Sequence, residues 1–151
     1  MTRHVVIPLA TAICICAMPP TARAHHSHPY FYDQCKTVTV EGRIDTIEFK
    51  DPHSVIVVNL DDGPAYTVDW NPLRRLTNDG IIGPAQAALV PGTRVAVTGN
   101  PIRHAAQIRR RFPNINSVNP NTIDPTLIRR VDDRWSWAGR RGPTPPDCVA
   151  R

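Results

Sequence analysis

The chain has 151 residues and carries 18 lysine and arginine residues against 13 aspartate and glutamate residues. The resulting net charge of +5 is too small to argue by itself for nucleic-acid binding, and the 16 prolines exclude long helices. The length suits one domain with a real hydrophobic core.

The first 24 residues have the organisation of a secretory signal. Arg3 supplies a positive charge, residues 5–18 are mostly apolar, and small residues at 22–24 form an Ala-x-Ala cleavage site. The apolar run is too short to cross a bilayer comfortably, since about 20 residues are needed. We therefore expect a cleaved signal over 1–24 and a periplasmic or secreted mature chain that starts at His25 and has no transmembrane segment. The alternative is an uncleaved anchor.

Two of the four cysteines lie inside the predicted signal and would be discarded with it. Cys35 and Cys148 remain, an even number in an oxidising compartment, so a disulfide between them is predicted. This bond would tie the proline-rich tail, residues 140–151, to the start of a domain that covers residues 25–139.

Alternating apolar and polar residues predict β-strands over much of the mature chain. The expected strands are 37–49, 55–60, 65–70, 92–100 and, around a turn at Asp132-Asp133, 126–137. Gly42 suits a bend or bulge within the long first strand.

Short helices are expected between the strands. The first covers residues 71–80, with Asn71 as its cap, Pro72 in its first position and Gly80 at its end. Further short helices are expected in the segments 84–89 and 101–113.

The segment 114–125 is rich in asparagine and proline and is predicted to be a loop. The resulting order, three strands, a helix and two strands, is that of a small, five-stranded OB-like barrel. We therefore expect an all-β fold of this kind with one or two short helices. A β-sandwich of similar size is the alternative.

Histidines concentrate at the predicted mature start. His25, His26 and His28 follow the cleavage site, and His53 follows the first strand. An N-terminal histidine offers its amine and its ring, which both ligate a metal once deprotonated, and Cu(II) favours nitrogen ligands in a roughly square arrangement. One more imidazole, best supplied by His53, would complete a three-nitrogen copper site.

Geometry and a simpler explanation both weigh against this copper site. Residues 25–36 would have to double back along the barrel to reach His53, which their number just permits if they are extended. The alternative is a solvated histidine tail, with the His53 ring bonded to the backbone of its own turn. His104 follows the fourth strand, on the ligand-binding side of an OB-like barrel, and could approach His53.

Aromatic and basic runs allow two interpretations each. The aromatics at 30–32 could stack on a sugar or base, but anchoring of the terminal segment to the core is favoured. Trp135 and Trp137 share one strand face; an exposed pair could bind carbohydrate or protein, but a plug at the end of the barrel is favoured. The basic run at 109–111 is typical of a solvated helix end more than of a phosphate site.

No pattern in the sequence indicates an enzyme. It has no nucleophile elbow, C-x-x-C redox pair or phosphate-binding loop, and its paired aspartates occupy predicted turns. The first hypothesis is an exported copper-binding protein for transport or buffering. The alternative is a metal-free module of the cell envelope that binds a protein or carbohydrate partner, and nucleic-acid binding is disfavoured by export.

Several motifs resemble a known family in their order and spacing. They are AHHS at 24–27, FYD at 31–33, DPHSVIVV at 51–58, NPLRRLTNDG at 71–80 and LVPGTRVAVTGNPIR at 89–103. The chain resembles a family of small secreted bacterial proteins of unknown function, with A-H-H-S at the cleavage site and N-P-H after the first strand. Asp51 replaces the usual asparagine of that second motif.

The resemblance implies secretion and a small β domain, and it brings no known activity. It matches His25, His26 and His53 to the family's histidines, whereas His104 has no counterpart there.

Overall fold

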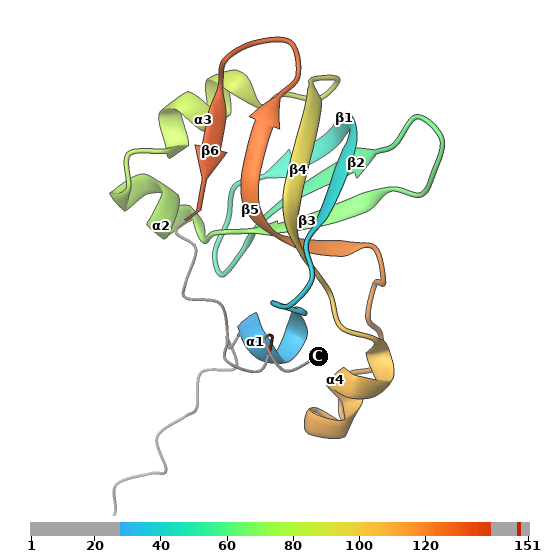
Figure 1. The fold of residues 1–151 in the computed structure, drawn as a ribbon. Coiled ribbons are helices and arrows are strands. Elements are labelled where there is room, and N and C mark those ends of the chain that lie inside the picture. Colours follow the sequence, from blue (N-terminus) through green and yellow to red (C-terminus); the bar gives the residue numbers. More distant parts are fainter. Residues whose placement is uncertain (1–27, 140–147, 149–151) are drawn as a thin grey trace, which may run out of the picture.

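The computed structural model describes residues 28–139 and residue 148, and it contains a closed β-barrel flanked by short helices (Figure 1). The strands are β1 (Val38–Glu48), β2 (Ser54–Asn59), β3 (Tyr66–Trp70), β4 (Arg94–Pro101), β5 (Thr122–Arg130) and β6 (Ser136–Ala138). They follow the order β3-β2-β1-β4-β5-β6, and a parallel β3–β5 pairing closes the barrel. β6 extends the sheet beyond β5. The expected five-stranded OB-like barrel is confirmed.

Short helices lie at two sides of the barrel. They are α1 (His28–Phe31), α2 (Leu73–Asn78), α3 (Ile82–Ala88) and α4 (Ala105–Arg111). Figure 1 shows α2 and α3 beside β6, with α1 and α4 together below the barrel. None of the helices in the described part of the chain has the length and apolar character that a membrane span requires.

Helix α2 begins later than the sequence predicted. Pro72, expected in the first helical position, is the cap residue instead, and its side chain makes no capping hydrogen bond. The carbonyl of Asn71, the expected cap, accepts a 3.2 Å hydrogen bond from the Ser54 amide, so this residue connects the helix to β2. Gly80 follows the helix with a φ of +70°, as expected of a residue that ends it.

The long first strand pairs with two neighbouring strands along different parts of its length. β1 pairs with β4 from Val38 to Arg43 and with β2 from Arg43 to Glu48. Gly42 lies where the two pairings meet, and a Cβ there would stand 2.2 Å from the Asn59 carbonyl oxygen. Glycine therefore permits the close approach of β2. The irregularity in register comes slightly later than the sequence predicted, between Ile44 and Thr46.

Gly42→Ala should destabilise the barrel by about 1–3 kcal/mol, because backbone atoms of β2 would have to move. Urea unfolding of the purified protein measures this loss. Gly83→Ala is the matched control, since nothing lies within 4 Å of a Cβ at that position in α3, and it should be neutral or slightly stabilising. Equal effects of the two substitutions would contradict the close-approach argument.

The predicted loop at 114–125 was wrong at its end, because β5 begins inside it at Thr122. Pro125 belongs to this strand and lies opposite Gly99, next to a shift in the β4–β5 register. A Cβ on Gly99 would stand 2.2 Å from the Asp124 carbonyl oxygen. Proline is tolerated in strands at such irregularities.

Tryptophan side chains pack together at one end of the hydrophobic core. Trp70, at the end of β3, is 1% exposed, and its ring centroid lies 5.2 Å from that of Trp137 in an edge-on arrangement. Trp135 and Trp137 are both partly buried against the core, while Ser136 between them is exposed. The pair therefore packs as the plug interpretation predicted.

A disulfide joins Cys35 to Cys148, with 5.1 Å between their Cα atoms, as the sequence predicted. This bond is consistent with an oxidising compartment. The expected signal at 1–24 and the rest of the tail at 140–151 lie outside the described residues.

Candidate functional site

The segment that contains α1 is fixed to the barrel through backbone hydrogen bonds. The Asp33 amide donates to the Pro101 carbonyl at 2.9 Å, and the Arg103 amide donates to the Phe31 carbonyl at 2.7 Å. Tyr32, between them, is only 5% exposed. We call residues 28–37, which precede β1, the N-terminal segment. This segment is therefore held against the end of β4 and the connection to α4.

Aromatic contacts reinforce this attachment. The Phe31 and Phe112 rings are stacked with their centroids 5.0 Å apart, and Tyr30 meets Phe112 edge-on at 6.1 Å. Ile108 is the buried residue of α4 and is 0% exposed. The run of aromatics at 30–32 thus anchors the segment, which was the favoured interpretation.

One carboxylate lies at the centre of the candidate site. The Tyr32 hydroxyl donates a hydrogen bond to Asp69 Oδ2, and His53 Nδ1 lies 2.7 Å from Asp69 Oδ1. Asp69 points away from the core, because Val68 and Trp70 on either side of it are buried. We call this set, Tyr32, Asp69 and His53, the Asp69 triad.

The barrel itself sets the spacing within the Asp69 triad. His53 directly precedes β2, where Ser54 pairs with Trp70 and Val55 pairs with Asp69. The regular β2–β3 ladder therefore brings the His53 ring to the Asp69 carboxylate. Tyr32 reaches the same carboxylate from the N-terminal segment, a separate part of the chain.

Burial, together with the neighbouring carboxylate of Asp69, raises the pKa of Tyr32 well above its ordinary value. The phenol therefore stays protonated across the physiological range and remains a hydrogen-bond donor. A histidine whose Nδ1 hydrogen bonds to a carboxylate presents Nε2 as its lone-pair nitrogen. Metal-binding histidines generally have this kind of outer partner.

The structure describes only some of the histidines that the sequence singled out. His53 belongs to the Asp69 triad, whereas His25 and His26 lie outside the described residues. His104 caps α4 instead, because its Nδ1 accepts a 3.3 Å hydrogen bond from the Ala106 amide. Within residues 28–139 and 148, no three side chains of histidine, cysteine, aspartate or glutamate are grouped so as to hold a metal ion.

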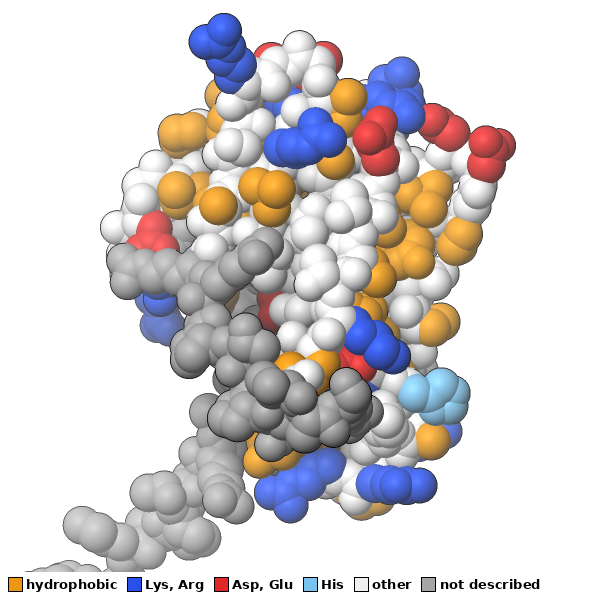
Figure 2. Space-filling model, in the orientation of Figure 1, with side chains coloured by type: hydrophobic (Ala, Val, Ile, Leu, Met, Phe, Trp, Pro, Cys, Tyr) orange, Lys and Arg blue, Asp and Glu red, His pale blue; other side chains and the backbone are white. Residues whose placement is uncertain are grey.

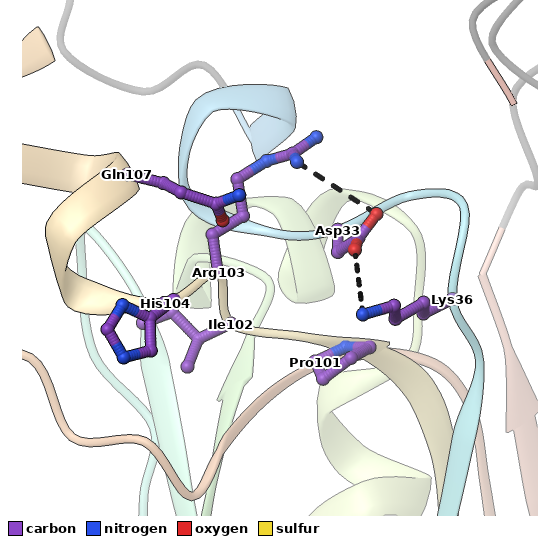
Figure 3. A pocket seen from close by; sticks show the side chains of 7 residues that line it. All are labelled: Asp33, Lys36, Pro101, Ile102, Arg103, His104 and Gln107. Carbon is purple, nitrogen blue, oxygen red and sulfur yellow. Dashed lines mark ion pairs between the residues drawn. The ribbon is translucent and has the colours of Figure 1, made fainter. Parts of the chain in front are cut away.

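A cavity of about 330 Å³ adjoins the N-terminal segment. Its lining residues are Asp33, Lys36, Pro101, Ile102, Arg103, His104 and Gln107 (Figure 3). The Asp33 carboxylate lies between two cations, 3.6 Å from Lys36 Nζ and 3.9 Å from Arg103 Nη1. The charged groups of this cavity thus pair with one another and help to hold the segment in place.

The basic run at 109–111 forms the exposed last turn of α4. Figure 2 shows lysine and arginine side chains at the lower end of the molecule, where this helix lies, and others at its upper end. The Arg111 guanidinium carbon lies 5.5 Å above the Tyr30 ring, a cation–π contact. The arrangement agrees with a solvated helix end.

Sequence reasoning identified His53 but missed the role of Asp69 and the hydrogen bond of Tyr32. One signal for Asp69 was present in the sequence. It is the single charged residue of β3, and the alternation of the strand places it on the outward-facing side. The Tyr32 contact had no signal, because it joins residues 37 positions apart through tertiary structure.

The fold and the Asp69 triad define a small OB-like barrel with an anchored N-terminal segment. The chain belongs to the Family of unknown function (DUF6152), whose model matches residues 12–109. The resemblance to a family of unknown function is thereby confirmed. No curated protein matches the sequence.

Two solved structures are similar in fold. The S. pombe Stn1–Ten1 complex matches with 17% identity and a TM-score of 0.42 over 64% of this chain and 59% of that one. An OBody, NL8, bound to hen egg-white lysozyme matches with 15% identity and a TM-score of 0.44 over 66% of this chain and 97% of that one.

Proposed function

We propose that the mature protein is an exported, non-enzymatic OB-like barrel that binds copper(II) for transport or buffering. Its ligands would be the amine and ring of His25 and the ring of His53, with His26 as a neighbouring donor. Signal cleavage after Ala24 creates the amine that this site requires.

The His53–Asp69 contact is the observation that carries the proposal. Because Nδ1 faces Asp69 Oδ1 at 2.7 Å, the ring is oriented and Nε2 is the nitrogen that a metal would take. The side chain is 28% exposed, so the imidazole is partly shielded but not sealed in the core.

The position of Tyr32 supports the proposal, since it weakens the objection that the N-terminal segment could not double back. The Tyr32 hydroxyl already meets the carboxylate that holds His53. Helix α1 starts at His28, and an extended chain from there back to His25 adds a reach of about 10 Å.

The test is a copper titration of the exported protein after its start has been established by intact-mass measurement. A chain that begins at His25 should bind one Cu(II) with submicromolar affinity. Competition with a chelator of known affinity measures that affinity. His53→Ala should weaken binding by about a hundredfold, more than most losses of an outer-shell partner.

Two controls separate this site from adventitious histidine binding. His104→Asn keeps an acceptor for the α4 cap and should leave the copper affinity unchanged. Acetylation of the mature amine removes that ligand and should weaken binding as His53→Ala does. Wild-type affinity in His53→Ala would refute the site, and a mature chain without copper affinity would favour the metal-free envelope module.

A further inference from the structure

Three distant parts of the chain share one carboxylate in the Asp69 triad. Tyr32 comes from the N-terminal segment, Asp69 from β3 and His53 from the turn before β2. The two oxygens of Asp69 serve different partners, Oδ2 the tyrosine hydroxyl and Oδ1 the histidine ring. Rotation of the carboxylate would disturb both contacts together.

We infer that Asp69 and Tyr32 are positioning residues, which hold His53 in the tautomer protonated at Nδ1 and couple its orientation to the docking of the N-terminal segment. For its metal-binding consequence, this inference rests on the proposed function. The tautomer itself can be measured without any metal.

Burial makes an accidental surface pair a poor explanation of this arrangement. Tyr32 is 5% exposed, and a phenol hydroxyl at such a depth is costly to leave without an acceptor. Asp69 supplies that acceptor, and its own side chain is only 22% exposed. The tyrosine therefore fixes the carboxylate, and the carboxylate in turn fixes the imidazole.

The backbone limits the freedom of the group still further. The β2–β3 register fixes where His53 lies along the strands relative to Asp69, through the pairs Ser54–Trp70 and Val55–Asp69. The backbone hydrogen bond from the Asp33 amide to the Pro101 carbonyl fixes the position of Tyr32 relative to β4. The side chains thus meet between two fixed backbones, which is the condition for a preorganised ligand.

The first measurement uses the metal-free mature protein with ¹⁵N-labelled histidine, at a pH where the nitrogen shifts themselves show that the His53 ring is neutral. In the wild type, the His53 nitrogen shifts should report a predominantly Nδ1-protonated neutral ring. Asp69→Ala should raise the population protonated at Nε2. Tyr32→Phe, which leaves the carboxylate in place, should produce a smaller change in the same direction.

The second measurement is the copper affinity of the same variants. Asp69→Ala should weaken binding by about 10–100-fold with the stoichiometry unchanged, and Tyr32→Phe by less than about tenfold. Tyr66→Phe, on β3 itself, is the matched control and should alter neither the tautomer nor the affinity. Circular dichroism shows that each variant is folded before it is compared.

The outcomes separate the two proposals. If the wild type shows the Nδ1-protonated ring and Asp69→Ala loses it, the positioning role stands even where no copper binds, and only the proposed function fails. If Asp69→Ala leaves the His53 tautomer as in the wild type, the positioning inference is overturned, whatever the copper affinity. Should Asp69→Ala not fold, Tyr32→Phe against Tyr66→Phe decides the same question.

Discussion

Replacing Cys35 and Cys148 together by serine should lower the free energy of unfolding of the protein by about 2–5 kcal/mol. The disulfide joins residues 113 positions apart in a chain of 151 residues, and so restricts the unfolded chain strongly. The loss should appear as a lower midpoint in guanidinium unfolding and a melting temperature lower by roughly 10–20 °C. A chemical reductant should have the same effect on the wild type.

The double variant supplies the control for this experiment, because a reductant should not destabilise a protein that lacks the bond. Cys35 lies close to Tyr32 in sequence, and its amide donates to Asp33 Oδ1 at 3.2 Å. The bond therefore joins the anchored N-terminal segment to the C-terminal tail. A change below about 0.5 kcal/mol on removal of both cysteines would contradict this stabilising role.

The strands were predictable because their signal is local. The alternation around Val40 and Ile44 in β1, and the β-branched run of β2, follow from the way a half-buried strand must place its side chains. β5 was harder, since Pro125 and the asparagines before it resemble a loop. The proline fits there because the β4–β5 register shifts next to Gly99, and that pairing is tertiary.

The candidate site likewise has one residue that local sequence predicts and contacts that depend on tertiary structure. His53 was predicted because it stands at the junction of a turn and a strand, which the sequence shows. Its contact with Asp69 follows from the β2–β3 register. The connection at 61–63, Asp-Asp-Gly, favours a hairpin but does not specify that register. Tyr32 was predicted to anchor the segment, but the carboxylate that receives its hydroxyl depends on how the barrel closes.

Trp70→Ala should cost about 3–5 kcal/mol in the free energy of unfolding, because it empties a fully enclosed part of the core. The Trp70 ring packs edge-on against Trp137 and lies 6.2 Å from Phe49, so its removal leaves the plug without support. Urea unfolding with matched m-values gives the loss. Asp69 precedes this residue on β3, so His53 nitrogen shifts report whether the Asp69 triad is disturbed as well.

Trp70→Phe separates packing from the indole nitrogen. No acceptor among the described residues lies within hydrogen-bonding distance of the buried Trp70 Nε1, and such a group carries a desolvation cost of about 1–3 kcal/mol. Phenylalanine removes that N–H and keeps an aromatic ring between Phe49 and Trp137, so the smaller volume is partly offset. The expected loss is therefore below about 1.5 kcal/mol. A loss as large as that of alanine would contradict this account.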